Sequence, residues 1–225
     1  MQQSVLEWDQ IFKDYGTQKP RYDNWLEKYH DYFEARKDLP VIDLGCGFGN
    51  DTLYLTERGY RVISCDYSVE ALQRLKYFIA NPETRHFDMT EGLPFDEGSS
   101  NVVIADLSLH YFAWHDTQQI VAEISRILVP GGYLLCRVNS VRDINYGAGQ
   151  GTMVEANYYN VSGRLKRFFD RDQIERLFVD WKTCYQNESE MQRYREVKII
   201  WEVALQKIKP NLPESRKGLE DGTNL

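Results

Sequence analysis

Residues 41–51 read VIDLGCGFGND and carry the most informative pattern in this chain. A short apolar run that ends at Leu44 leads into three glycines spaced two residues apart, Gly45, Gly47 and Gly49. A glycine has no Cβ, so it can turn sharply, adopt φ > 0 and let a ligand approach the main chain. The pattern therefore predicts a strand, a ligand-binding loop and the beginning of a helix.

Three polar residues indicate which ligand the loop binds. The usual dinucleotide fingerprint has a third glycine where this chain has Asn50. Asp43 lies within the apolar run and would repel a phosphate, whereas it would favour a ligand with a positive centre. S-adenosylmethionine, with its sulfonium and α-ammonium groups, is such a ligand. Asp66 ends the next predicted strand, where an acid can accept hydrogen bonds from both ribose hydroxyls.

The chain resembles the class I S-adenosylmethionine-dependent methyltransferases across roughly residues 40–140. The resemblance rests on the segments DLGCGFG (43–49), GYRVISCD (59–66) and PGG (130–132). Residues 51–59 and 66–68 further resemble the small-molecule branch that includes the tellurite-resistance and thiopurine methyltransferases. The resemblance implies an enzyme that uses S-adenosylmethionine as its cofactor and methylates an acceptor.

The hydrophobic pattern alternates strands with helices, which argues for a parallel sheet covered on both faces. We predict an N-terminal helical cap from two stripes of apolar residues, at 4–15 and 21–36. Pro130 and the glycines after it are expected to break the chain before the next strand. The predicted strands are 40–44, 61–65, 84–88, 101–106 and 132–139, and the predicted helices are 51–58, 69–79 and 117–128.

The alternation ends after residue 140. Residues 141–163 are rich in Gly, Asn and Tyr and show no clear period, which suggests a lid or substrate loop. A helix capped by Asp170 follows, and strands at 180–188 and 196–207 should pair as an antiparallel hairpin. We therefore expect an α/β, Rossmann-like, doubly wound sheet of seven strands with the last strand antiparallel. The predicted organisation is a single domain at 1–208, with a cap at 1–36, a substrate insertion at 141–168 and a polar tail at 209–225.

Ligands of open α/β sheets bind outside the carboxyl ends of the strands, which locates the candidate cofactor residues. The resemblance implies that Asp88 accepts from the adenine amine, and Met89 can cover the ring with a soft apolar surface. Asp88 as an ordinary turn residue is the alternative. The predicted cofactor-binding residues are Asp43, Gly45, Cys46, Gly47, Gly49, Asp66, Tyr67, Asp88, Met89, Ala105, Asp106 and Leu107.

The segment after the fourth predicted strand faces the expected methyl group. His110 and Tyr111 are the candidate catalytic residues, because a histidine can remove a proton near neutral pH. A packed or helix-capping histidine is the alternative. Methyl transfer requires alignment and water exclusion more than a dedicated catalytic side chain. Several aromatic residues are candidates for the wall of the acceptor pocket, or alternatively for the core: Tyr146, Tyr158, Tyr159, Phe168 and Phe169.

Composition limits the partners. A net charge of −7 disfavours nucleic acid as the acceptor, although the basic run at 164–167 could hold an anionic substrate or be a solvated face. The four cysteines lie far apart, so we expect reduced thiols and no metal site. No apolar run is long enough for a membrane span and no signal peptide is visible, so we expect a cytoplasmic protein.

The leading hypothesis is a methyltransferase that acts on a small molecule. A nicotinamide-dependent oxidoreductase is one alternative, and Asp43 and Asn50 argue against it. A cofactor-binding regulator or partner subunit without turnover is another, because methyl transfer leaves no obligatory catalytic signature. A protein acceptor also stays open. The oligomeric state and the acceptor atom do not follow from the sequence.

Overall fold

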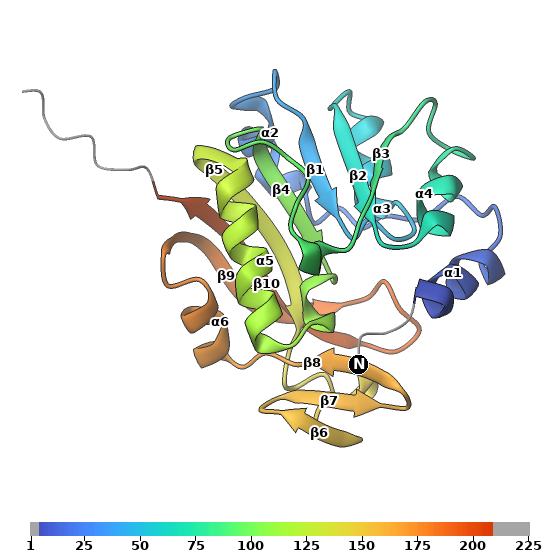
Figure 1. Cartoon of the computed structure of the whole chain (residues 1–225), viewed down its shortest axis with the longest axis vertical. Coiled ribbons are helices and arrows are strands. Elements are labelled where there is room, and N and C mark those ends of the chain that lie inside the picture. Colours follow the sequence, from blue (N-terminus) through green and yellow to red (C-terminus); the bar gives the residue numbers. More distant parts are fainter. Residues whose placement is uncertain (1–4, 209–225) are drawn as a thin grey trace, which may run out of the picture.

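The computed structural model describes residues 5–208, and its main element is a sheet in the order β3-β2-β1-β4-β5-β10-β9 (Figure 1). The first five strands are mutually parallel, whereas β10 is antiparallel to both of its neighbours. The strands are β1 (Val41–Leu44), β2 (Val62–Asp66), β3 (Glu83–His86), β4 (Ser100–Asp106), β5 (Leu128–Asn139), β9 (Trp181–Met191) and β10 (Lys198–Lys207). This topology confirms the predicted seven-stranded mixed sheet with an antiparallel last strand.

Helices cover both faces of the sheet because the side chains of a strand alternate between them. Ile42 and Leu44 pack in one apolar cluster with α5 (Trp114–Ile127) and α6 (Arg171–Leu177). Val41 packs in a second cluster with α2 (His30–Glu34), α3 (Asn50–Thr56) and the short η1 (Glu27–Tyr29). The helix α4 (Val69–Leu75) packs on β2 and β3 and contacts α1 (Val5–Asp14) (Figure 1).

The N-terminal cap differs from its prediction. The first predicted helix is present as α1, but the second, at 21–36, is wrong over its first part, since helical residues begin only at Glu27. Three side chains before that point bond to distant parts of the chain: Tyr22 to Glu57 and Trp25 to Asp51 at the two ends of α3, and Asp23 to Arg137 of β5. These tertiary contacts fix residues 22–25 against α3 and β5 and override the helical periodicity of the segment.

The proline–glycine break before β5 is also a correction. β5 begins at Leu128 and continues through Pro130, Gly131 and Gly132. The register against β4 shifts between Ser100 and Val102, and Gly131 adopts φ +83°. The strand therefore absorbs these residues as a local irregularity.

Residues 141–163 are more ordered than the absence of a period suggests. After η4 (Ile144–Tyr146), a three-stranded antiparallel sheet runs through β6 (Thr152–Glu155), β7 (Tyr158–Val161) and β8 (Arg164–Arg167). Asn157 and Ser162 turn the chain at positive φ, together with Gly163. The sequence does not reveal these strands because β6 is exposed along most of its length and β7 and β8 are only partly buried, so none of the three shows a clear apolar alternation.

The carboxyl ends of β1 and β2 point toward the side of the molecule where α1 and the small sheet lie (Figure 1). Three short helical turns continue from strands on that side or lie close to it: η2 (Met89–Glu91), η3 (Leu109–Tyr111) and η4. None of the helices between Val5 and Ile208 combines the length and the apolar character needed to cross a membrane. The predicted polar tail at 209–225 lies outside the described residues.

Candidate cofactor and acceptor site

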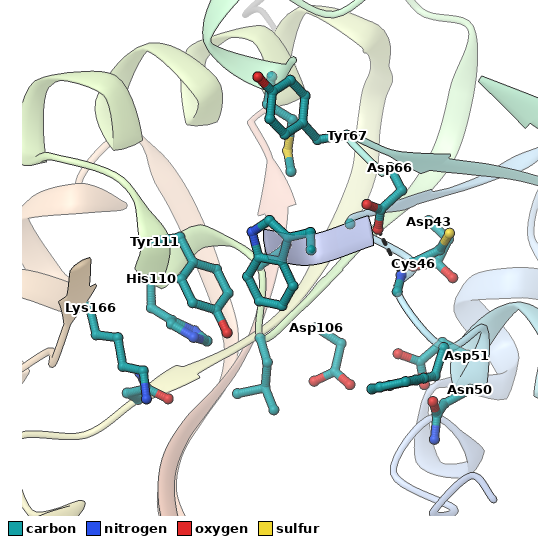
Figure 2. A pocket seen from close by; sticks show the side chains of 18 of the residues that line it. Asp43, Cys46, Asn50, Asp51, Asp66, Tyr67, Asp106, His110, Tyr111 and Lys166 are labelled. Atoms are coloured by element: carbon teal, nitrogen blue, oxygen red, sulfur yellow. Dashed lines mark hydrogen bonds between the residues drawn. The ribbon is translucent and has the colours of Figure 1, made fainter. Parts of the chain in front are cut away.

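A cavity of about 300 Å³ opens at the carboxyl ends of β1, β2 and β4 (Figure 2). All predicted site residues line it except Gly49 and Ala105. Those that do are Asp43, Gly45, Cys46, Gly47, Asp66, Tyr67, Asp88, Met89, Asp106, Leu107, His110 and Tyr111. The cavity thus brings the predicted cofactor residues and the predicted acceptor residues to one place.

The glycine loop is held tightly against β2. The backbone N–H groups of Gly45 and Cys46 both donate to the carbonyl oxygen of Cys65, at 2.8 and 2.9 Å. Gly45 has φ +74°, and a Cβ there would lie 2.5 Å from the Cβ of Ser108. Glycine is therefore required at this position by the backbone angle and by the close approach of the segment after β4.

Gly49 has a different role from the other loop glycines. It adopts φ +81°, and a Cβ there would overlap the side chain of Leu75 in α4. Gly49 consequently permits α3 and α4 to pack closely. Gly47, by contrast, lines the cavity, and a Cβ on it would make an ordinary contact of 3.6 Å with Phe12.

Asp66 joins two loops through one carboxylate. Its Oδ2 accepts from the backbone N–H of Gly47 at 2.8 Å (Figure 2), and its Oδ1 accepts from that of Ser68 at 2.9 Å. Burial raises the pKa of Asp66, and these backbone donors oppose the rise. The residue predicted to bind ribose therefore also sets the geometry of the glycine loop.

Asp43 makes the same end of the cavity acidic. Thr52 Oγ1 donates to its carboxylate at 2.6 Å. Burial raises the pKa of Asp43 to about 7, and the charges of Asp106 and Asp66 add to the rise, whereas the hydrogen bond from Thr52 lowers this pKa. A cation bound here would favour the ionised carboxylate, whereas a phosphate would add to the repulsion. The carboxylates at this end of the cavity thus fit a ligand that carries positive charge, such as a sulfonium or an ammonium group.

Asp106 is part of a buried ionic network. Arg137 Nε lies 2.7 Å from Asp106 Oδ1, and Arg193 Nη1 lies 2.7 Å from Asp106 Oδ2. Both arginines also bond to Asp23 in the N-terminal segment. Leu107 follows at φ +55°, an unfavourable angle for a leucine, and its N–H donates to the Arg137 carbonyl at 2.9 Å. The network fixes the end of β4 where the cavity begins.

Asp88 caps its own turn. Its Oδ1 accepts from the backbone N–H of Thr90 at 2.9 Å and from the Thr90 hydroxyl at 2.7 Å. This is the turn role considered as the alternative, although the side chain still lines the cavity beside Met89. The adenine contact stays a prediction for both residues.

His110 and Tyr111 lie together at the other end of the cavity, with ring centroids 4.2 Å apart (Figure 2). Burial lowers the pKa of His110 well below its ordinary value, and the charges of Lys198 and Lys166 lower it further. Burial also raises the pKa of Tyr111. Both side chains are therefore neutral at neutral pH. Trp8 of α1 contacts the Tyr111 ring edge-on at 5.0 Å, so the N-terminal cap closes this end.

The aromatic wall is smaller than predicted. Tyr146 lines the cavity, but Phe168 and Phe169 are fully buried in the core, and the Tyr158 hydroxyl donates to the Tyr111 carbonyl at 2.9 Å. Tyr159 packs near Phe168 instead. Of these five residues, only Tyr146 lines the cavity.

Other lining residues were not predicted as site residues from the sequence, although Asn50 argued there against a dinucleotide and Lys166 belongs to the basic run at 164–167. They are Trp8, Phe12, Phe48, Asn50, Asp51, Ser108, Phe112, Asn139, Lys166, Arg193, Tyr194 and Lys198. Asp51 carried a usable signal, as an acid two residues after the last loop glycine. Arg193 and Lys198 carried none, because only the β9–β10 hairpin brings them to the cavity.

Comparison with known proteins identifies the central part of this fold. A family model described as a methyltransferase domain matches residues 42–136, which contain the glycine loop, Asp66 and the end of β4. This region therefore resembles a methyltransferase domain. Together with the sheet topology, the match supports a class I S-adenosylmethionine-dependent methyltransferase and S-adenosylmethionine as its cofactor.

Individual relatives match over parts of the chain. An uncharacterized methyltransferase of Synechocystis is 37% identical over 93 residues, which are 41% of this chain and 43% of that protein. A tRNA N(3)-cytidine methyltransferase of Gallus gallus is 26% identical over 166 residues, covering 68% of this chain and 45% of that protein. The chain thus spans less than half the length of either relative.

Among solved structures, an S-adenosylmethionine-dependent methyltransferase from Methanosarcina mazei superposes with a TM-score of 0.69 at 18% identity. The match covers 81% of this chain and 97% of that one. The shared fold therefore extends beyond residues 42–136.

Proposed function

We propose that this protein transfers a methyl group from S-adenosylmethionine to a small-molecule acceptor, as in the small-molecule branch that the sequence resembles. One observation carries the proposal. A single cavity joins the acidic glycine loop at Asp43 and Asp66 to the neutral pair His110 and Tyr111 (Figure 2). A volume of about 300 Å³ suits compact ligands.

The protein side of the reaction consists mainly of positioning. When bound, S-adenosylmethionine supplies a methyl group already activated on a sulfonium. We assign cofactor binding to Asp66, Gly45 and Gly47. Trp8 and Tyr111 exclude water from the acceptor end. This arrangement favours in-line attack, since alignment of nucleophile and methyl supplies much of the rate enhancement.

The first test is ligand binding. S-adenosylhomocysteine is expected to stabilise the protein in a thermal-shift assay and NADH is not, because the loop offers glycine contacts and the carboxylate of Asp43 but no binding site for a phosphate. A larger thermal shift with NADH than with S-adenosylhomocysteine would instead favour a nicotinamide-dependent oxidoreductase.

Asp66→Ala should weaken S-adenosylhomocysteine binding by roughly 1.5–3 kcal/mol, the scale of hydrogen bonds to a charged group. Isothermal calorimetry measures this directly. Asp180→Ala removes an exposed carboxylate outside the cavity and is the control, with unchanged affinity expected. Unchanged affinity in Asp66→Ala as well would disprove the ribose assignment.

A general-base role for His110 has its own test. His110→Ala should lower the rate with a hydroxyl acceptor by about 100-fold or more, while a thiol acceptor, which ionises unaided, should lose little. His115→Ala, an exposed histidine in α5, is the matched control. Initial rates across pH make the comparison. Equal retention on both acceptors would make His110 a structural residue.

A tRNA acceptor is the second candidate, because the Gallus gallus relative that covers 68% of this chain bears that activity in its name. The net charge of −7 argues against it, since tRNA binding depends on neutralised phosphates. Methyl-transfer assays with tRNA beside thiol, amine, hydroxyl and carboxyl acceptors separate the two. Binding of S-adenosylhomocysteine without transfer to any acceptor would favour the regulator alternative.

A further inference from the structure

Strand alternation divides the basic run at 164–167 into two roles. Arg167 is 1% exposed, and it pairs with Glu155 and donates to the Ala156 carbonyl at 3.1 Å. Lys166 is the adjacent residue of β8, so its side chain leaves the opposite face of the strand and reaches the cavity (Figure 2). Arg167 therefore holds the small sheet together through its buried contacts, while Lys166 remains available to a ligand.

Lys166 differs from the other cations of the cavity. Lys198 lies 2.8 Å from the buried carboxylate of Asp143, and Arg193 is paired with Asp106 and Asp23. The hydrogen bond from Lys166 Nζ is to the carbonyl oxygen of Tyr146, at 3.5 Å. Within residues 5–208, no carboxylate pairs with Lys166. A positive charge in this cavity thus lacks a counter-ion.

The surroundings of Lys166 reinforce that imbalance. Burial lowers the pKa of Lys166, and the charges of Lys198 and Arg164 lower it further, with Asp143 opposing them. An anion placed here would offset both the burial and the repulsion. β8 also packs against η3, so Lys166 lies on the same side of the cavity as His110 and Tyr111 (Figure 2).

We propose that the methyl acceptor is a small organic anion whose carboxylate or phosphate group is bound by Lys166. The inference rests on the proposed function and specifies its substrate class. The cavity is acidic at the Asp43 end and basic at the Lys166 end, so its charge orients the acceptor with its anionic group away from the cofactor. The nucleophilic atom of the acceptor then lies beside His110 and Tyr111.

Binding of matched probes to the protein saturated with S-adenosylhomocysteine tests the proposal. The probes are benzoate against benzamide, 3-mercaptopropionate against its amide, inorganic phosphate, and tRNA. At least one anion should bind about tenfold or more tightly than its neutral counterpart, the scale of a hydrogen bond to a charged group. Inorganic phosphate has no neutral counterpart among these probes, so its affinity for the wild-type protein is compared with its affinity for Lys166→Met.

Lys166→Met should abolish the preference for the anion, and Lys166→Arg should retain part of it. Lys182→Met is the control, because it removes an exposed lysine of β9 outside the cavity. A preference for phosphate alone would identify the anionic group as a phosphate. The proposal is overturned if no anion is preferred, if the preference survives Lys166→Met, or if tRNA alone shows a Lys166-dependent affinity. Affinity for S-adenosylhomocysteine, measured in each variant, separates this outcome from failure of the proposed function.

Discussion

Asp106→Ala is expected to lower the free energy of unfolding by about 3–5 kcal/mol, because it removes the main counter-ion of a buried arginine. The side chain of Arg137 is only 3% exposed, and its other carboxylate partner, Asp23, is 34% exposed. The guanidinium of Arg193 would lose the same partner. Urea denaturation without cofactor measures the loss directly and keeps it apart from any effect on binding.

The control is an exposed pair of the same chemistry. Arg61 and Glu83 lie 3.0 Å apart with side chains 60% and 41% exposed, so Glu83→Ala should cost less than about 1 kcal/mol. A loss in Asp106→Ala no larger than in this control would mean that the network contributes little.

The loss in Asp106→Ala should also depend on pH. Burial raises the pKa of Asp106, but the charges of Arg137 and Arg193 outweigh it and hold the pKa well below the ordinary range. An aspartate in the unfolded chain has a pKa of about 3.9. The contribution of the Asp106 carboxylate to stability is therefore complete above that pH and is lost as the pH falls through the folded-state pKa. The difference in the free energy of unfolding between Asp106→Ala and the wild-type protein should therefore be constant around neutral pH and become smaller in acid.

Gly45→Ala is the second large effect, with an expected loss of roughly 2–5 kcal/mol in the free energy of unfolding. A left-handed backbone costs an alanine about 1–2 kcal/mol, and overpacking adds about 1–3 kcal/mol. The overpacking arises because the new Cβ would lie 2.5 Å from the Ser108 Cβ. Displacement of the loop should also weaken S-adenosylhomocysteine binding, which calorimetry measures.

Gly59→Ala separates the two contributions. Gly59 has φ +79°, close to the +74° of Gly45, but a Cβ on it would meet no atom within 4 Å. Its variant should show only the backbone strain and should bind S-adenosylhomocysteine normally. Equal losses in the two alanine variants would show that the contact with Ser108 is relieved at no cost.

Much of the geometry around the glycine loop could be predicted because its signals are local. The three glycines follow an apolar strand directly, and Asp66 ends the next strand, so parallel pairing of β1 with β2 alone brings Gly47 and Asp66 together. The alternation of strands and helices likewise predicted the parallel part of the sheet, and its end predicted the terminal antiparallel hairpin. These features depend on residues near one another in the chain and on backbone rules that hold in any context.

The acceptor side was decided by the tertiary structure. Arg193 meets Asp23 across 170 positions of the chain, and Lys198 meets Asp143 across 55. No local period marks such pairs, since each forms only after the β9–β10 hairpin and the N-terminal segment have packed on the sheet. The basic run at 164–167 was visible in the sequence. Which of its cations is buried in an ion pair and which faces the cavity depended on β8, a strand at the edge of the small sheet whose residues show no apolar alternation.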